Sequence, residues 1–327
     1  MKLQYPFIQL PLTFDATALA AEIQALGESV WRPHPQGFPG NSALPLIAHG
    51  GDPNNDDVRG RMQPTPHLAQ LPYLREVLGS LGAVFGRSRL MRLSGNAEVT
   101  PHVDLDYYWR DHMRVHVPIV TQPEVSFHCG GQRIHMAAGE CWIFDTWRTH
   151  KVINSADRSR IHLVADTVGG NDFWELLKRS RVLGHTAPWN PQHRAPGGPE
   201  PQLRFESTNL PAVMTPWELR EQLTFILDEA VPDARLGQLH QLAGELGRDW
   251  RALWAWHGED RVGWPDYRQR MDRFMREADR ISQGMHLQNG LAMMRAIASL
   301  VGLIAVADEI GTGAAKADER SGMAPMA

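Results

Sequence analysis

Two histidines and one aspartate in this 327-residue chain have the types and spacing of an iron site. His102 and Asp104 are separated by one residue, and in an extended strand such side chains point to the same face. A more distant histidine, His150, completes a set of three ligands. Two histidines and one carboxylate on one side of a metal leave other coordination positions open, which is typical of non-heme Fe(II) oxygenases.

An arginine ten residues after His150 meets a second requirement of such a site. Arg160 begins the segment 160–166, whose aliphatic residues alternate with the others and predict a strand. In that strand Arg160 shares a face with His162, and we expect this polar face to look into the interior of a barrel. A guanidinium presents paired N–H donors to a carboxylate in a geometry that lysine does not offer. Arg160 is therefore expected to hold an acidic cosubstrate.

The His-x-Asp pattern by itself is weak evidence, because a chain with 15 histidines contains it easily by chance. The neighbouring segments strengthen it. Residues 89–94 and 139–145 have strand patterns on either side, and a Thr-Pro turn directly precedes His102. The alternative is a solvated loop that holds His102 and Asp104 without a metal.

Residues 86–170 resemble the aspartyl/asparaginyl β-hydroxylase family of Fe(II)/2-oxoglutarate-dependent dioxygenases, and they are also similar to bacterial free-proline hydroxylases. The motifs that carry the resemblance are Arg89-Leu-Met-Arg-Leu, Pro101-His-Val-Asp, Arg114-Val-His-Val-Pro, Gly139-Glu-Cys-Trp-Ile-Phe-Asp, His150 and Arg160-Ile-His-Leu-Val-Ala-Asp. It implies that His102 and His150 are iron ligands. Animal aspartyl hydroxylases of the family lack the carboxylate ligand, whereas this chain has Asp104. We therefore do not transfer their protein substrate directly.

The resemblance also implies a binding site for 2-oxoglutarate, which reacts with dioxygen at the iron. Arg160 is implied to bind one of its carboxylates, and Arg114 and His116 to assist with the carboxylates. Met91 and Leu93, in the strand pattern before the iron ligands, are expected at the same cosubstrate site. Because all three protein ligands are present, we predict hydroxylation rather than halogenation.

Five side chains are candidates for contact with the substrate. Asp106 shares the face of His102 and Asp104 if the strand continues, so it could bind an amine; a solvated loop carboxylate is the alternative. Arg148 could meet a carboxylate, with a surface cation as its alternative. The other candidates are Tyr108 at the expected barrel mouth, and Asn41 and Arg61 in a Pro/Gly/Asn-rich segment expected to cover it.

The composition is that of an ordinary globular protein, with 43% hydrophobic and 21% charged residues. A net charge of −4 gives no sign of a nucleic-acid partner. The two cysteines, Cys129 and Cys141, are expected to be buried thiols rather than a disulfide framework. We predict a cytoplasmic protein with no membrane contact, because the apolar segment 296–307 is shorter than the roughly 20 residues that a membrane span needs.

Closely spaced strand patterns from residue 87 to 167, separated by Gly-containing turns, predict a double-stranded β-helix of the jelly-roll, cupin-like type. We expect residues 1–85 to form helix and loop regions flanking it and 86–185 to form this barrel core. A linker is expected over 186–215, a helical module over 216–310 and a flexible tail over 311–327.

The helical module shows patterns at 216–229, 235–257, 265–283 and 285–309, and no set of residues typical of catalysis. It is a candidate for homodimerisation or for covering a substrate. For the whole chain the leading hypothesis is a hydroxylase acting on an amino acid, an amino-acid-like metabolite or a peptidyl Asp/Asn-type side chain. The alternatives are a metal-dependent cupin enzyme without 2-oxoglutarate, and a non-catalytic barrel used as a sensor or scaffold.

Overall fold

The computed structural model describes residues 1–34, 37–186 and 188–307, which divide into two compact units. The first unit contains residues 1–104 and 108–209. Within the described residues, the second contains residues 105–107 and 210–307. The segment 311–327, expected to be a flexible tail, lies outside the described residues.

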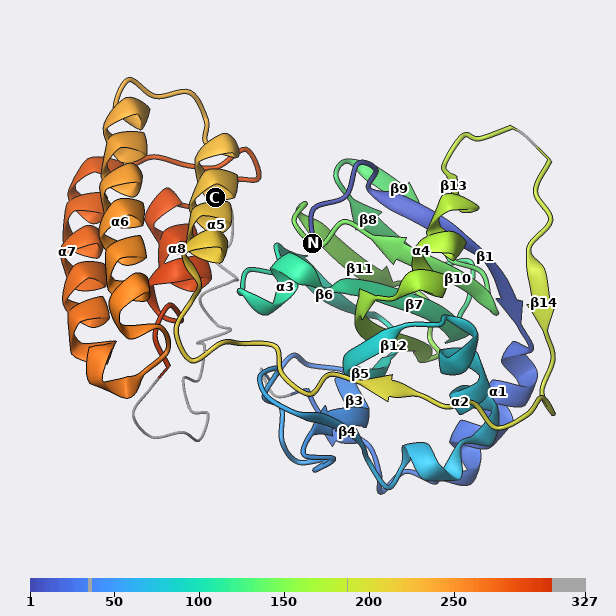
Figure 1. The fold of residues 1–327 in the computed structure, drawn as a ribbon. Helices are drawn as coiled ribbons and strands as arrows, with labels where there is room; N and C mark the ends of the chain where they lie inside the picture. The colour runs from blue at the N-terminus through green and yellow to red at the C-terminus, as the bar shows by residue number, and fades with distance from the viewer. Residues whose placement is uncertain (35–36, 187, 308–327) are drawn as a thin grey trace. The chain divides into compact units, whose positions relative to one another are not determined.

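Two sheets form the first unit (Figure 1). The larger has eleven strands with β13-β1-β10-β7-β12-β5-β3-β2 as its main order, and the smaller has four in the order β6-β11-β8-β9. All pairings are antiparallel except those of β14 with β1 and of β15 with β5. The strands of the larger sheet are β1 (Phe7–Phe14), β2 (Arg32–Pro33), β3 (Asn41–His49), β4 (Met62–Pro64), β5 (Val84–Leu93), β7 (Met113–Val120), β10 (Glu140–Phe144), β12 (Arg160–Gly169), β13 (Arg181–Val182), β14 (Gln192–Arg194) and β15 (Arg204–Phe205). Those of the smaller are β6 (Ala97–His102), β8 (Val125–Cys129), β9 (Gln132–Ile134) and β11 (His150–Asn154).

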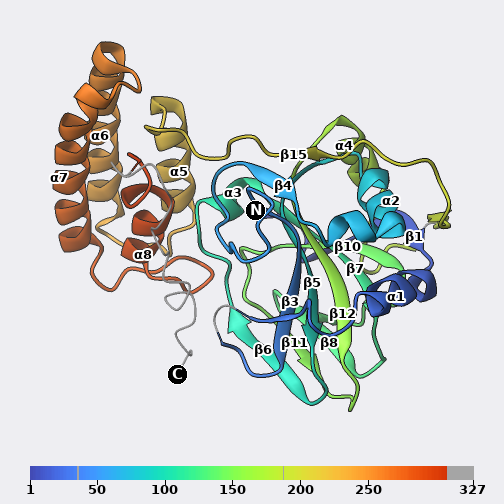
Figure 2. The same cartoon turned by 90° about the horizontal axis from the view of Figure 1, so that it is seen from below.

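Helices cover the outer face of the larger sheet (Figure 2). They are α1 (Ala16–Ala25), α2 (Pro72–Ser80) and α4 (Asn171–Lys178), and their buried side chains join one apolar core with the sheet. Asp15 caps α1 by accepting a hydrogen bond from the backbone N–H of Ala18, and Pro72 opens α2, where its missing N–H costs nothing. A short helix, α3 (Tyr108–Asp111), follows the small sheet's first strand.

The inner face of the larger sheet packs against the smaller sheet through a second apolar core, formed by side chains such as Phe127, Phe144 and Val152. Strand β12 illustrates the alternation between the two faces. Leu163 and Ala165 belong to the outer core. Arg160 and His162 have the opposite parity, so they lie on the inner face, as the alternation predicts.

The expectation of a β-rich core with added helices is confirmed, and eight strands, β5 to β12, run between Val84 and Gly169. Two details differ. Among the described residues no strand pairing joins the two sheets, so they face each other without closing into a barrel. The expected linker 186–215 also contributes β14 and β15 to the larger sheet.

The prediction that residues 1–85 form only helix and loop is wrong for β1 and β3, which are strands of the larger sheet. Strand β1 is buried on both faces, so its sequence lacks the polar alternation that marks a half-exposed strand. Strand β3 contains Pro45, which favoured a loop interpretation. In the structure the ladder between β3 and β5 shifts register after Pro45, where a missing N–H donor is tolerated.

The second unit is built from α5 (Pro216–Asp228), α6 (Leu236–His257), α7 (Trp264–Ser282), α8 (Met293–Ile297) and the π-helical turn η3 (Ala298–Gly302). A capping box begins α5, where Thr215 and Glu218 each satisfy the other's backbone N–H. The helix expected from residue 285 begins only at Met293, because a turn precedes it in which Gly290 has a φ of 85°. No helix among the described residues combines the length and apolar character that crossing a membrane requires.

We predict that Leu163→Ala lowers the free energy of unfolding by about 2–5 kcal/mol, because it opens a cavity beneath the outer helices. Urea denaturation of the purified protein measures this. Ile161→Ala on the same strand is the control, since Ile161 is only partly buried and should cost less. Equal losses in the two variants would contradict the assigned outer core.

Candidate metal centre and adjoining cation

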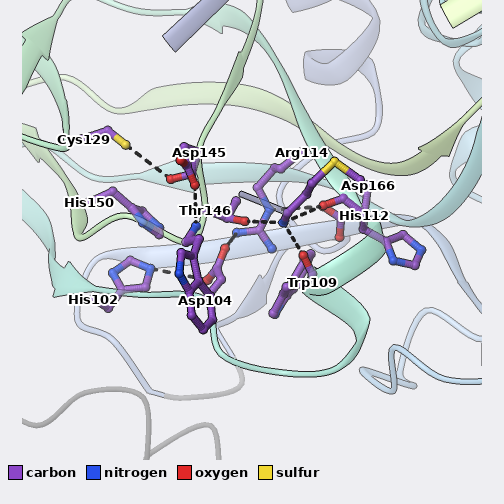
Figure 3. Close-up of polar contacts among 12 residues, drawn as sticks. His102, Asp104, Trp109, His112, Arg114, Cys129, Asp145, Thr146, His150 and Asp166 are labelled. Atoms are coloured by element: carbon purple, nitrogen blue, oxygen red, sulfur yellow. Dashed lines mark hydrogen bonds and ion pairs between the residues drawn. The ribbon is translucent and has the colours of Figure 1, made fainter. Parts of the chain in front are cut away.

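The antiparallel pairing of β6 and β11 brings His102 and His150 side by side. The two residues are direct register partners, and their ring centroids lie 4.2 Å apart. Asp104 follows two residues after β6 ends, and its backbone N–H donates to the carbonyl oxygen of Thr146 at 3.1 Å. This hydrogen bond fixes the turn that directs the carboxylate toward the two rings (Figure 3).

His102, Asp104 and His150 each offer one ligand atom, and these atoms all lie within 4.8 Å of one another. His102 Nε2 lies 3.8 Å from Asp104 Oδ1. His150 is buried, while His102 and Asp104 are partly buried. The three residues predicted from spacing alone are therefore brought together in a group that could hold a metal ion.

The backbone sets the tautomer of both histidines. His102 Nδ1 lies 2.8 Å from the carbonyl oxygen of Thr100, and His150 Nδ1 lies 2.9 Å from that of Arg148. A carbonyl only accepts, so each Nδ1 carries the proton and each Nε2 keeps its lone pair for a metal. Burial, and then the neighbouring His102, lower the pKa of His150 to about 3, which keeps its ring neutral.

Asp104 is held as a carboxylate by Arg114. Burial alone would raise the pKa of Asp104, but Arg114 first, and then His150 and His102, lower it to about 2. Arg114 Nη1 donates to Asp104 Oδ2 at 2.9 Å, and Arg114 Nε donates to Asp166 Oδ1 at 3.1 Å. Asp104 is therefore ionised at neutral pH, as a metal ligand must be.

In the structure Arg114 binds carboxylates of the chain itself, and its assistance to the cosubstrate stays a prediction. Two of its N–H groups are used by carboxylates of the chain itself, and its guanidinium lies 4.0 Å from the ring centroid of Trp109. It supports Asp104 through this ion pair. Sequence analysis did not single out Asp166 or Trp109, although Asp166 stands an even number of residues after Arg160 on the same strand and hence on the same face.

Arg160 is a buried cation whose Nε and Nη1 atoms have no hydrogen-bond partner among the described residues. Burial lowers its pKa to about 10, so it remains charged at neutral pH. His116 and His162 lie nearby with both ring nitrogens unpartnered within the same described part of the chain, and their rings are 5.8 Å apart. Burial, followed by the charge of Arg160, lowers the pKa of both rings well below the usual value.

Such groups are costly to bury without partners, because each has lost its hydrogen bonds to water. A bound anion would satisfy Arg160. The site also adjoins the candidate metal ligands through aromatic contacts: the ring centroid of Phe144 lies 4.8 Å from that of His150 and 5.2 Å from that of His116. The arrangement therefore pairs a metal-binding group with an anion-binding group inside one sheet sandwich.

The other predicted contacts differ in their placement. Leu93 and Met91 are register partners of Arg160 and His162, so they lie beside the unpartnered groups. Asn41 is the register partner of Leu93 on the next strand and is also buried. These three positions line the same inner face as the anion-binding group.

Two of the substrate candidates, Tyr108 and Arg148, have partners within the chain. Tyr108 is buried and stacks on His112, and its hydroxyl accepts from the backbone N–H of Arg87. Arg148 Nε donates to Asp145 at 2.9 Å. Asp106 belongs to the three residues that cluster with the helical unit, and Arg61 is exposed. The type of these side chains did not by itself predict their burial or their partners in the folded chain.

Comparison with known proteins gives relatives for the sheet unit. L-proline cis-3-hydroxylase 1 of a Streptomyces species is 36% identical over 142 residues, which is 40% of this chain and 48% of the relative. L-proline cis-3-hydroxylase 2 of a Streptomyces species is 32% identical over 123 residues, or 35% of this chain and 40% of the relative. The chain thus spans about half the length of the curated relatives that it matches.

Solved structures are similar at lower identity. A 2OG-Fe(II) oxygenase family oxidoreductase from Burkholderia pseudomallei has 18% identity and a TM-score of 0.33, covering 46% of this chain and 80% of the other. A Pseudomonas putida prolyl-4-hydroxylase has 16% identity and a TM-score of 0.33, covering 50% and 92%.

The family comparison agrees with the motifs that first suggested a resemblance. Residues 44–169 match the family model described as aspartyl/asparaginyl β-hydroxylase. The matched range contains all three candidate metal ligands and Arg160. The resemblance to the aspartyl/asparaginyl β-hydroxylase family is therefore confirmed over residues 44–169.

Proposed function

We propose that this protein is an Fe(II)/2-oxoglutarate-dependent dioxygenase that hydroxylates an unactivated carbon of an amino acid, with succinate and CO₂ as co-products. One observation carries the proposal. The group of His102, Asp104 and His150 shares the inside of the sandwich with Arg160, a buried cation that lacks a hydrogen-bond partner at two nitrogens among the described residues. We also assign the two facing sheets to the double-stranded β-helix fold predicted from the sequence.

The residues present fit both groups that this reaction needs. Two neutral imidazoles and one carboxylate are the donor set of non-heme Fe(II) oxygenases. Arg160 fits a carboxylate of 2-oxoglutarate, because its planar donors would gain charged hydrogen bonds that the folded chain does not supply. His116 and His162 have ring nitrogens in the same buried region with capacity for further hydrogen bonds.

When bound, Fe(II) and 2-oxoglutarate would supply the oxidising power of a reaction in which one oxygen atom of O₂ enters succinate and the other becomes the new hydroxyl. The chain's residues prepare that chemistry. The Thr100 and Arg148 carbonyl oxygens orient the two imidazoles, and Arg114 keeps Asp104 ionised. The buried rings of Phe127 and Phe144 exclude water from the region between the sheets, which strengthens every charged contact there.

The substrate class follows from the relatives. The two similar L-proline cis-3-hydroxylases support a small amino acid as substrate. The second candidate substrate is a peptidyl Asp/Asn-type side chain, as the resemblance to the aspartyl/asparaginyl β-hydroxylase family suggests.

Anaerobic titration of the metal-free protein with Fe(II) and then 2-oxoglutarate tests the proposal without knowledge of the substrate. We expect a saturable visible metal-to-ligand charge-transfer band. His102→Ala should abolish it while the circular dichroism spectrum is retained, since the imidazole is partly exposed and contributes little to packing. Iron binding without the band would contradict the role of 2-oxoglutarate, and absence of iron binding would contradict the whole proposal.

Replacing Arg160 tests the anion-binding role. Arg160→Lys keeps a positive charge but loses the paired donors, so we expect the Kd for 2-oxoglutarate to rise about 10–100-fold. The charge-transfer band measures this Kd, and the Kd for Fe(II) measured alone should stay unchanged. An unchanged 2-oxoglutarate Kd would remove Arg160 from its assigned role.

Replacing Arg114 tests its effect on Asp104. The guanidinium lowers the pKa of Asp104, so Arg114→Gln should raise that pKa and let protons compete with the metal at higher pH. We expect the Fe(II) affinity of the variant to fall more steeply than that of the unmodified protein as the pH is lowered from 7.5 to 5.5. Parallel pH profiles would show that Arg114 does not control the ionisation of Asp104.

A further inference from the structure

Directly after the candidate metal ligand Asp104, the chain leaves the sheet unit for three residues. Leu105–Tyr107 cluster with residues 210–307 in the helical unit, whereas Asp104 and Tyr108 both belong to the sheet unit. Consecutive Cα atoms are only about 3.8 Å apart, so the conformation of these three residues limits where Asp104 can lie. Whatever holds this segment in place therefore also acts on Asp104.

Both ends of the segment are fixed within the sheet unit. The backbone N–H of Asp104 donates to the carbonyl oxygen of Thr146 at 3.1 Å, and its carboxylate accepts from Arg114 (Figure 3). At the other end, the buried ring of Tyr108 stacks on His112 with the ring centroids 3.6 Å apart. The three residues between these fixed points have few conformations that join them.

Tyr107 holds the segment within the helical unit. Its side chain is buried, with 6% exposed, and its hydroxyl donates to Oε1 of Glu218. Both residues belong to the helical unit. A buried tyrosyl hydroxyl needs a hydrogen-bond partner, and a carboxylate is a stronger acceptor than a neutral oxygen. The bond to Glu218 therefore restrains the end of the segment that precedes Tyr108.

The carboxylate that accepts this bond is well anchored, because Glu218 belongs to the capping box at the start of α5. Its backbone N–H donates to Oγ1 of Thr215 at 3.2 Å. The neighbouring Met214 donates its N–H to the carbonyl oxygen of Ala305 at 2.8 Å, and its own carbonyl accepts from Nε1 of Trp250 at 2.7 Å. The start of α5 is thus tied to two other parts of the helical unit.

These contacts have an energetic consequence for a metal ion that binds Asp104. Ordering the backbone of a flexible residue costs conformational entropy, and three residues adjoin the carboxylate here. When the hydrogen bond of Tyr107 has already ordered them, metal binding does not have to do so. Pre-organisation of this kind increases affinity without adding a contact to the ligand.

We propose that Tyr107 is a positioning residue for Asp104. Through its hydrogen bond to Glu218, it holds the intervening segment in the conformation in which the Asp104 carboxylate faces the two candidate histidine ligands. This inference rests on the proposed function, because it assigns Asp104 to a bound metal ion. Tyr107 acts through the backbone, so its loss weakens the metal site without removing a ligand.

Amide hydrogen exchange of the metal-free protein tests the positioning directly. The reporter is the backbone N–H of Asp104, which exchanges when its hydrogen bond to Thr146 opens. Tyr107→Phe removes the hydroxyl donor and keeps the buried ring, so the fold should be retained. We expect the Asp104 amide to exchange about tenfold faster in this variant, measured by NMR of the ¹⁵N-labelled protein.

Anaerobic titration with Fe(II) and then 2-oxoglutarate gives the second readout. We expect Tyr107→Phe to raise the Kd for Fe(II) about 3–10-fold, less than the roughly 10–100-fold of a residue bonded directly to a metal ligand. The charge-transfer band should shift or broaden, because a less ordered Asp104 alters the metal's surroundings. Glu218→Gln keeps a carbonyl acceptor and the capping pattern, so it should retain most of the affinity.

Two further variants separate positioning from general stability. Tyr73→Phe is the matched control, because the buried Tyr73 hydroxyl donates to the carbonyl oxygen of Arg194 and accepts from the N–H of Asp15, in the outer core of the sheet unit. Its Asp104 exchange rate and Fe(II) Kd should stay unchanged. Combining Tyr107→Phe with Glu218→Ala should weaken Fe(II) binding no further than Glu218→Ala alone, because both changes remove the same bond.

The contrary results are distinct. An unchanged Asp104 exchange rate in Tyr107→Phe, or an unchanged Fe(II) Kd with an unaltered band, would overturn this inference and leave the proposed function standing. Equal acceleration of exchange in Tyr73→Phe would show a general loss of stability and would overturn it as well. If the unmodified protein bound no Fe(II), the proposed function itself would fail, and with it the role of Tyr107 toward a metal.

Discussion

The guanidinium of Arg114 joins two carboxylates that come from different parts of the sandwich. Asp166 lies on β12 of the larger sheet, whereas Asp104 follows β6 of the smaller one. A single, partly buried cation thus ties the loop that bears a candidate metal ligand to the larger sheet. Removing one member of such a network leaves an uncompensated charge in a region of low dielectric constant, so its members depend strongly on one another. The position of Asp104 relative to the two histidines depends on this connection.

The two faces of the larger sheet have different roles. Outward side chains of the larger sheet, such as Leu163 and Leu90, join the helices in the main apolar core and supply stability. Inward side chains carry charge or ring nitrogens, and the apolar layer around Phe127 and Phe144 surrounds them. Because successive residues of one strand alternate between the two faces, the same strand stabilises the fold and holds the site. Charged groups can therefore be kept close together in the interior without weakening the main core.

The three candidate metal ligands and Arg160 could be singled out from the sequence, because residue type and even spacing on a strand determine which face a side chain occupies. The pairing of His102 with His150 could not, since register depends on contacts between distant segments. Arg114 shows the same limit. Its place on the inner face was predictable, but its partners were not, because only the folded chain brings Asp104 and Asp166 within hydrogen-bonding distance of it. Tyr108 was predicted from its expected place at the barrel mouth, whereas the packing of its ring against His112 could be seen only in the folded chain.

The division of the chain into two units has a consequence for any attempt to separate them. Leu105–Tyr107 directly follow Asp104 in sequence but cluster with residues 210–307, and the Tyr107 hydroxyl donates to Glu218 at the start of α5. A polypeptide ending at Asn209 would consequently keep these three residues without the side chains that bury them, immediately next to a metal ligand. The sheet unit is thus not one contiguous segment of the chain, because residues 105–107 interrupt it. The chain therefore passes from one compact unit to the other directly after Asp104, a candidate metal ligand.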